Sequence, residues 1–216
     1  MDKKRVQAVV FDMDGVLVDN THFHNESWQM FCRDHDIKLS KEELSRFTIG
    51  RTVKDVFRDW FGQDISDDQI EQYREEKERY YRKIFRPNLK STPGLMSFLN
   101  YLREQKISMS IATSGHPENV DFIVDGLKIR EYFSAIINSD DVTRGKPDPQ
   151  VYLLAAERLC VNPEDCLAVE DTPVGVESAK NAKMKCLAVL FSYSRDDLKQ
   201  ADYIIKDFTE FDKKLL

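Results

Sequence analysis

The chain has 216 residues, a formal net charge of −6, 41% hydrophobic residues and 32% charged residues, a balance typical of a soluble globular protein. The negative charge argues against nucleic acid as a partner, and no apolar run approaches the roughly 20 residues of a membrane-spanning helix. The four cysteines have no C-x-x-C spacing, so we expect reduced thiols in the cytoplasm rather than zinc or disulfides. We also expect a monomer.

The first predicted element is a buried β-strand that ends in acidic residues. Residues 6–11 form an apolar, β-branched run, which continues into Asp12-Met13-Asp14-Gly15. Side chains two residues apart in extended chain share a side, so Asp12 and Asp14 can face one site. Gly15 permits the sharp turn that follows. Two carboxylates this close repel each other unless a cation or a proton lies between them.

The next part of the chain, residues 19–89, is rich in charged and aromatic residues and contains no convincing strand. Residues 24–37, 54–62 and 67–85 have the pattern of amphipathic helices, and the loop-like stretch "RPNLKSTPG" follows them. We therefore predict a small α-helical domain over 19–89, inserted into a second domain formed by 1–18 and 90–216.

Short apolar runs then alternate with helical patterns to the end of the chain. The predicted strands cover 107–112, 135–138, 166–169, 186–190 and 203–205, and the predicted helices lie within 93–106, 119–129, 149–161 and 172–182. This alternation predicts an α/β fold, in which a Rossmann-like parallel sheet carries helices on both faces.

Polar side chains also follow the later strands. Thr113 and Ser114 follow the second strand, Lys146 lies in the loop after the third, and Glu170 and Asp171 follow the fourth. Ligands of open α/β sheets bind beyond the carboxyl ends of the strands, so these residues should meet Asp12. Carboxylates are hard ligands for Mg²⁺, hydroxyl and ammonium groups suit phosphate oxygens, and a carboxylate can be a nucleophile. The set predicts a metal-assisted phosphoryl-transfer site.

Four short motifs in this order resemble those of the haloacid dehalogenase superfamily of phosphotransferases. They are, in chain order, Asp12 to Gly15, Thr113, Lys146, and Glu170 with Asp171. The helical insert directly after the first motif resembles the small cap of the β-phosphoglucomutase-like branch. The resemblance covers the whole chain, and four motifs in order at strand ends are far more specific than one.

The resemblance implies a mechanism with two aspartates. Asp12 attacks phosphorus and forms an aspartyl-phosphate, while Asp14 donates a proton to the departing oxygen. Asp14 then accepts a proton from water or from a second substrate hydroxyl as the intermediate breaks down. An acid at position 14 favours phosphate esters over carbon–halogen bonds, because an alkoxide leaves poorly without a proton whereas a halide does not need one.

The resemblance also implies the ligands. Mg²⁺ would be held by Asp12, the Asp14 backbone carbonyl and Asp171, with Glu170 binding directly or through water. Lys146 would restrain Asp12 and offset charge repulsion with the phosphate. The phosphate oxygens would be bound by Thr113 and by the Ser114 backbone amide.

The helical domain carries the expected substrate-binding residues. A cap histidine of the mutase helps to position its acid, and His24 matches that histidine in spacing. The stretch "IGRT", which holds Gly50 and Arg51, resembles the substrate-reading loop, and Lys77 resembles a cap lysine that touches the substrate. The alternative for His24 and Lys77 is an ordinary position on a helix surface.

Departures from the mutase pattern favour hydrolysis. Val53 stands where the mutase carries an arginine that grips the distal phosphate, and Gly115 and Pro117 stand where it has a serine and an asparagine. We therefore predict a Mg²⁺-dependent phosphatase of small phosphorylated metabolites, in particular sugar phosphates. The alternative is a β-phosphoglucomutase that interconverts β-glucose 1-phosphate and glucose 6-phosphate.

Overall fold

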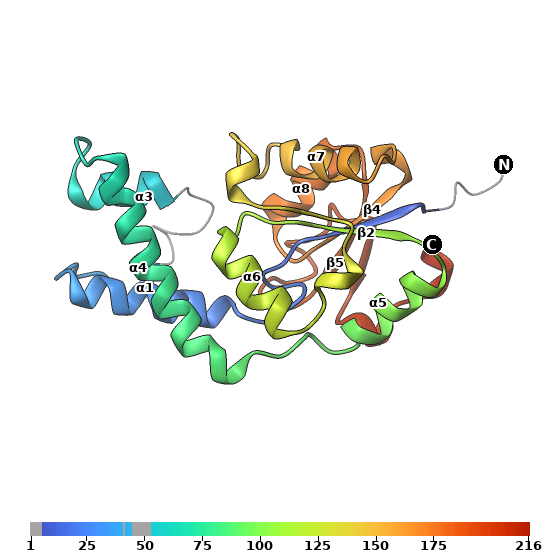
Figure 1. Cartoon of the computed structure of the whole chain (residues 1–216), viewed down its shortest axis with the longest axis horizontal. Coiled ribbons are helices and arrows are strands. Elements are labelled where there is room, and N and C mark those ends of the chain that lie inside the picture. Colours follow the sequence, from blue (N-terminus) through green and yellow to red (C-terminus); the bar gives the residue numbers. More distant parts are fainter. Residues whose placement is uncertain (1–5, 41, 45–52) are drawn as a thin grey trace. The chain divides into compact units, whose positions relative to one another are not determined.

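The structure is a computed structural model, and it describes residues 6–40, 42–44 and 53–216. The chain forms two compact units (Figure 1). We call Met1–Asp19 together with Leu89–Leu216 the sheet unit, and Asn20–Asn88 the helical unit. Each is described by itself.

The sheet unit is built on a six-stranded parallel sheet with the order β3-β2-β1-β4-β5-β6. The strands are β1 (Ala8–Phe11), β2 (Ser108–Ala112), β3 (Ala135–Ile137), β4 (Cys166–Glu170), β5 (Lys185–Val189) and β6 (Tyr203–Ile205). In the register, Phe11 at the end of β1 pairs with Ile111 on one side and Val169 on the other. The strand order reverses direction at β1, which makes the carboxyl end of this central strand the expected ligand site. The predicted α/β fold is confirmed.

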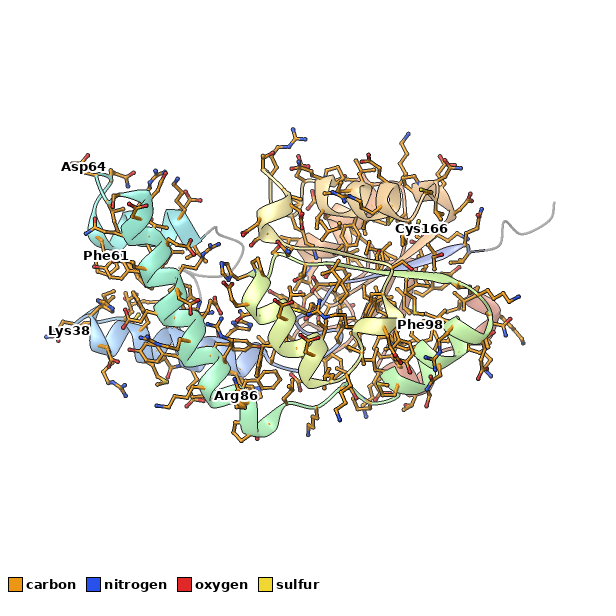
Figure 2. All side chains as sticks on the ribbon, in the orientation of Figure 1. Lys38, Phe61, Asp64, Arg86, Phe98 and Cys166 are labelled. Carbon is orange, nitrogen blue, oxygen red and sulfur yellow. The ribbon has the colours of Figure 1, made fainter. Side chains whose placement is uncertain are left out.

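Helices cover both faces of this sheet. They are α5 (Leu95–Glu104), α6 (Pro117–Gly126), α7 (Gln150–Arg158) and α8 (Pro173–Asn181), with 3-10 turns at Arg130–Tyr132, Ser139–Asp141, Pro163–Asp165, Phe208–Glu210 and Lys213–Leu215. Residues alternate between the faces along β1. Ala8 and Val10 pack in a buried cluster with α7 and α8, whereas the Phe11 ring lies 5.8 Å from that of Phe98 on α5. Figure 1 shows α7 and α8 together on one side of the sheet, and Figure 2 labels Phe98 on α5.

The helical unit contains α1 (Thr21–Asp34), α3 (Val53–Phe61), α4 (Asp67–Phe85) and the 3-10 turn Arg86–Asn88. Ser66 and Gln69 form a capping box at the start of α4. Aromatic side chains fill the core, where the ring centroids of Phe31 and Phe57 are 5.2 Å apart and Trp28 packs beside both. Within the described part of the chain, no helix combines the length and apolar character needed to cross a membrane.

Candidate active site

The site begins in the tight turn that follows β1. The Asp12 amide donates a hydrogen bond to Val169 O (2.9 Å), which extends the β1–β4 pairing by one residue. The Gly15 amide then donates to Val18 O (2.8 Å), and Gly15 has a φ of +78°. A Cβ at position 15 would lie 2.0 Å from Asp171 Oδ2. The absence of a side chain therefore lets the Asp171 carboxylate lie against this turn.

Lys146 joins two acids from different strands. Its Nζ donates to Asp12 Oδ1 (2.8 Å) and to Glu170 Oε1 (2.6 Å), and only 8% of its side chain is exposed. Burial alone would lower the pKa of this ammonium, but the charges of Asp12 and Glu170 and their hydrogen bonds hold that pKa above its usual range. Lys146 is therefore charged at neutral pH.

The three carboxylates around Lys146 carry more negative charge than this one lysine balances. One oxygen from each of Asp12, Glu170 and Asp171 lies within 4.8 Å of the others. Burial, opposed by Lys146 and reinforced by Glu170 and Asp14, raises the pKa of Asp12 from 3.8 to about 7. Burial and the charges of Glu170 and Asp12 raise the pKa of Asp171 well above its usual value.

This carboxylate cluster fits a divalent cation. Asp171 Oδ1 is buried and accepts no hydrogen bond from the residues that the structure describes. A buried carboxylate oxygen without a donor is costly in free energy, and a cation would satisfy it. Because all the groups are hard oxygen ligands, the donor set suits a hard divalent cation.

Glu170 is the most fully hydrogen-bonded acid of the cluster. Its Oε1 accepts from Lys146 and from the Tyr152 hydroxyl (2.8 Å), and its Oε2 accepts from the Asp171 amide (3.0 Å) and from Thr172. Tyr152 was not predicted as a site residue. The available signal was its spacing: it lies six residues after Lys146 and places a hydroxyl between the apolar Val151 and Leu153 in the first turn of α7.

The second motif lies beside Asp14. A Cβ on Gly115 would lie 3.2 Å from Thr113 Oγ1 and 3.5 Å from Asp14 Oδ2, so these two polar side chains approach the same point. Thr113 is buried and its hydroxyl accepts from the Gly115 amide (2.9 Å), whereas Ser114 is exposed. The structure thus gathers residues from the ends of β1, β2 and β4 with Lys146, although their catalytic roles stay predictions.

In the helical unit, the structure brings two of the predicted substrate-binding residues together. Lys77 Nζ lies 2.9 Å from His24 Nδ1 and donates to Glu78 Oε1 (2.9 Å). His24 stacks on Tyr81 at a centroid distance of 3.9 Å, and Lys77 is buried rather than displayed on a helix surface. The predicted residues Gly50 and Arg51 lie outside the described residues.

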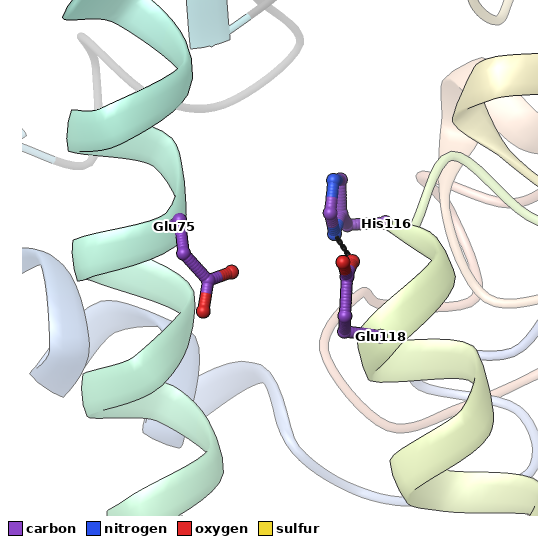
Figure 3. A group of neighbouring side chains, drawn as sticks. All are labelled: Glu75, His116 and Glu118. Carbon is purple, nitrogen blue, oxygen red and sulfur yellow. Dashed lines mark ion pairs between the residues drawn. The ribbon is translucent and has the colours of Figure 1, made fainter.

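Figure 3 draws His116 and Glu118 of the sheet unit together with Glu75. His116, at the start of α6, forms an ion pair with Glu118 through Nδ1. Glu75, also drawn, belongs to α4 of the helical unit, where Arg82 donates to its Oε1 (2.7 Å). His116 and Glu118 were not among the predicted site residues.

The family model described as haloacid dehalogenase-like hydrolase matches residues 9–189, which is most of the chain. Together with the parallel sheet and the acidic cluster at its switch point, this match shows that the chain belongs to the haloacid dehalogenase-like hydrolases. The predicted family is confirmed, and the relatives include members of its β-phosphoglucomutase-like branch.

Three curated relatives show the range of this family. The chain is 28% identical over 204 residues to a validoxylamine A 7'-phosphate phosphatase of Streptomyces hygroscopicus subsp. limoneus, covering 94% of this chain and 95% of the relative. It is 31% identical to a phosphorylated carbohydrates phosphatase of Thermotoga maritima, covering 82% of each. It is also 28% identical to a β-phosphoglucomutase of Bacillus subtilis, covering 85% and 83%.

A solved structure extends the likeness to the whole fold. The crystal structure of a haloacid dehalogenase hydrolase from Entamoeba histolytica superposes with a TM-score of 0.86 at 30% identity, covering 96% of each chain.

Proposed function

We propose that this protein is a Mg²⁺-dependent phosphatase that hydrolyses small phosphate monoesters, sugar phosphates in particular, through a phosphoryl group carried on Asp12. The observation that carries the proposal is the buried contact between Lys146 and Asp12 Oδ1, set beside Glu170 and Asp171 at the central strand of the sheet. A nucleophilic carboxylate, a permanent cation and a divalent-cation site lie together there.

Asp12 suits the role of nucleophile. Its backbone is held by the β1–β4 pairing and its carboxylate by Lys146, so the side chain is oriented before a substrate binds. In the first step an Asp12 oxygen bonds to phosphorus and the bond from phosphorus to the ester oxygen breaks. In the second step the oxygen of water bonds to phosphorus, the bond to Asp12 breaks, and phosphate leaves.

Asp14 suits the role of proton carrier. It is partly exposed, unlike Asp12, and its carboxylate lies near Gly115, close to which the Thr113 hydroxyl also lies. In the proposal it gives its proton to the departing ester oxygen in the first step and takes a proton from the attacking water in the second. The phosphate oxygens are bound by Thr113, the Ser114 amide and Lys146.

The proposed Mg²⁺ ligands are Asp12, Asp14 through its backbone carbonyl, and Asp171, with Glu170 direct or through water. When bound, Mg²⁺ neutralises charge between the anionic nucleophile and the phosphate. The buried Asp171 Oδ1 and the raised pKa values of Asp12 and Asp171 support a cation at this cluster.

The relatives support sugar phosphates as the substrate class, because their names include phosphatases of a phosphorylated carbohydrate and of validoxylamine A 7'-phosphate. In the proposal, residues 19–89 form a cap domain whose His24, Gly50, Arg51 and Lys77 contact the alcohol part of the substrate. The contact between the buried Lys77 and the partly buried His24 supports a role beyond that of a helix surface. We further propose a monomeric protein of the cytoplasm.

The second candidate is a β-phosphoglucomutase, and the relative from Bacillus subtilis favours it. ³¹P NMR separates the two activities in one sample that contains Mg²⁺, β-glucose 1-phosphate and a trace of glucose 1,6-bisphosphate. A growing orthophosphate signal supports the phosphatase, and a growing glucose 6-phosphate signal supports the mutase. A panel of other sugar phosphates then tests the substrate class, with Asp12→Asn as the inactive control. Phosphate release that persists in Asp12→Asn would contradict the nucleophile.

A further inference from the structure

Tyr152 places one polar atom inside an apolar cluster. Its side chain is fully buried on α7, among Val151, Ala155 and Ala156. Phenylalanine would fill nearly the same volume without taking a hydroxyl group out of water, which is costly unless the hydroxyl is hydrogen-bonded. The hydroxyl must therefore be judged by what it contacts.

Among the described residues, the polar contacts of the Tyr152 hydroxyl are with Glu170 of the carboxylate cluster and with Lys146 beside it. The hydroxyl donates to Glu170 Oε1 (2.8 Å), and Lys146 Nζ lies 3.5 Å from the hydroxyl oxygen and 5.0 Å from the ring centroid. Glu170 Oε1 thus receives one charged donor, Lys146, and one neutral donor, Tyr152. Of the three ammonium hydrogens of Lys146, two serve Asp12 and Glu170, and the third faces the tyrosine oxygen and ring.

The neutral donor has a distinct physical use. Lys146 must divide its attraction between Asp12 and Glu170, and a bound phosphate would add a third anion. The Tyr152 hydroxyl, by contrast, is an uncharged donor on a side chain that is fully buried on α7, and it donates to Glu170 at 2.8 Å. Glu170 therefore keeps one hydrogen bond that does not depend on where the lysine points.

We propose that Tyr152 is a positioning residue: its hydroxyl fixes the Glu170 carboxylate and, through Glu170, keeps the Lys146 ammonium against Asp12 Oδ1. The effect on turnover rests on the proposed function, whereas the effect on Lys146 is a property of the protein without metal or substrate. The two are tested separately.

The first test is NMR of metal-free protein labelled with ¹³C and ¹⁵N in lysine. The Lys146 signal is assigned by its loss in Lys146→Arg. We expect Tyr152→Phe to shift this Nζ signal and to speed the exchange of its hydrogens with water. The matched control is Tyr132→Phe, which removes a hydroxyl that donates to Asn100 Oδ1 (2.8 Å) in the same unit and should leave the Lys146 signal in place. An unmoved signal in Tyr152→Phe would overturn the proposal.

The second test is hydrolysis of p-nitrophenyl phosphate with saturating Mg²⁺. Loss of one hydrogen bond to a buried carboxylate should lower kcat about tenfold in Tyr152→Phe. KM should change less than about twofold, because the tyrosine does not touch the substrate. In a Glu170→Gln background the same substitution should have a much smaller effect, since the two act through one carboxylate. Additive effects in this double-mutant cycle would contradict the positioning role.

The outcomes separate this inference from the proposed function. A shifted Lys146 signal in a protein that hydrolyses no phosphate ester supports the contact and overturns the phosphatase. An active enzyme in which Tyr152→Phe changes neither signal nor kcat overturns the inference alone. If Tyr152→Phe fails to fold, the unaltered protein provides the test. Its buried Tyr152 hydroxyl hydrogen should exchange slowly with water and show cross-relaxation with the Lys146 side chain. Absence of this cross-relaxation would contradict the proposal.

Discussion

The two units each bury a lysine, and the two lysines have different surroundings. Lys146 in the sheet unit contacts two carboxylates, Asp12 and Glu170, from two neighbouring strands. Lys77 in the helical unit contacts one carboxylate, its neighbour Glu78, and otherwise the imidazole of His24 and the ring faces of aromatic residues. The first lysine lies in an excess of negative charge, and the second lies in a nearly neutral, aromatic setting.

The difference reflects how each unit brings side chains together. Parallel strands end at one edge of the sheet, so acids that are far apart in the sequence converge there whatever their mutual repulsion. Helix packing in the other unit joins residues mainly through apolar and aromatic contacts, and its polar contacts pair single groups of α4 with groups in or just after α1, such as Lys77 with His24 and Glu76 with His35. A site that concentrates like charge is suited to a metal and to phosphate, whereas the helical unit is suited to shape and hydrogen-bond recognition.

The largest expected effect is on turnover, and it should differ between substitutions of the two lysines. Lys146→Met should lower kcat about a thousandfold, because it removes charge stabilisation at the reacting group. Lys77→Met should lower kcat/KM only about tenfold, because it removes one proposed substrate contact of roughly 1.4 kcal/mol. Steady-state phosphate release with a sugar phosphate measures both, and circular dichroism checks folding. Equal losses of kcat/KM in the two variants would contradict the different roles proposed for the two lysines.

Asp14→Asn tests the proton carrier. We expect kcat/KM for a sugar phosphate to fall about 10²–10³-fold, a range usual for a lost general acid. With p-nitrophenyl phosphate the loss of kcat/KM should be far smaller, because p-nitrophenolate leaves without a proton. Asp19→Asn is the control, since this exposed aspartate lies outside the carboxylate cluster. A similar loss with both substrates would show that Asp14 does not act on the leaving group.

Glycines test how tightly each unit holds its backbone. A Cβ on Gly175 would lie 2.0 Å from the Glu170 carboxylate, whereas nothing lies within 4 Å of a Cβ on Gly145. Urea unfolding should show a loss of about 1–3 kcal/mol for Gly175→Ala from overpacking, and almost none for Gly145→Ala.

In the helical unit, Gly62 has a φ of +102° and open space around its Cβ position. Gly62→Ala should therefore cost about 1 kcal/mol from backbone strain alone and leave kcat unchanged. A lower kcat in Gly62→Ala, or an unchanged kcat in Gly175→Ala, would contradict the assignment of the chemistry to the sheet unit.

The smallest effects concern charge and stability without metal. Burial raises the pKa of Asp12 from 3.8 to about 7, so the folded state binds a proton more tightly than the unfolded chain. Ionisation of Asp12 therefore costs stability as the pH rises from 3.8, and the cost is complete above pH 7. In a chelator at pH 8, Asp12→Asn should raise the free energy of unfolding by about 1–2 kcal/mol.

This gain should vanish as the pH falls toward 4. Glu78→Gln in the helical unit should have the opposite sign, because it removes the carboxylate partner of Lys77. Thermal unfolding from pH 4 to 8 measures both variants. A destabilised Asp12→Asn at pH 8 would mean that its contact with Lys146 outweighs the buried charge.

Most of the fold could be predicted from sequence because buried parallel strands are short apolar runs with distinctive ends. All six predicted strands are present, with boundaries that differ by two residues or less. The same logic placed Asp12, Lys146 and Asp171 at one edge of the sheet, since each follows a strand. Helix periods likewise predicted α4 over 67–85.

The contacts between side chains could not be predicted in the same way. Tyr152 belongs to an apolar helix face, and only the packing of α7 on the sheet shows that its hydroxyl meets Glu170. The Lys77–His24 contact joins residues 53 positions apart on two helices, and no local pattern specifies which turns of α1 and α4 meet. Such pairings depend on tertiary packing rather than on propensity.

The most direct test of the central claim is to trap the phosphoryl group. The protein is mixed with Mg²⁺ and a sugar phosphate that it turns over, quenched within milliseconds in acid, and reduced with borohydride, which converts an aspartyl-phosphate into homoserine. Peptide mass spectrometry then locates the converted residue. The account predicts homoserine at position 12 in the unaltered protein. Turnover without conversion at position 12, or conversion at another aspartate, would contradict it.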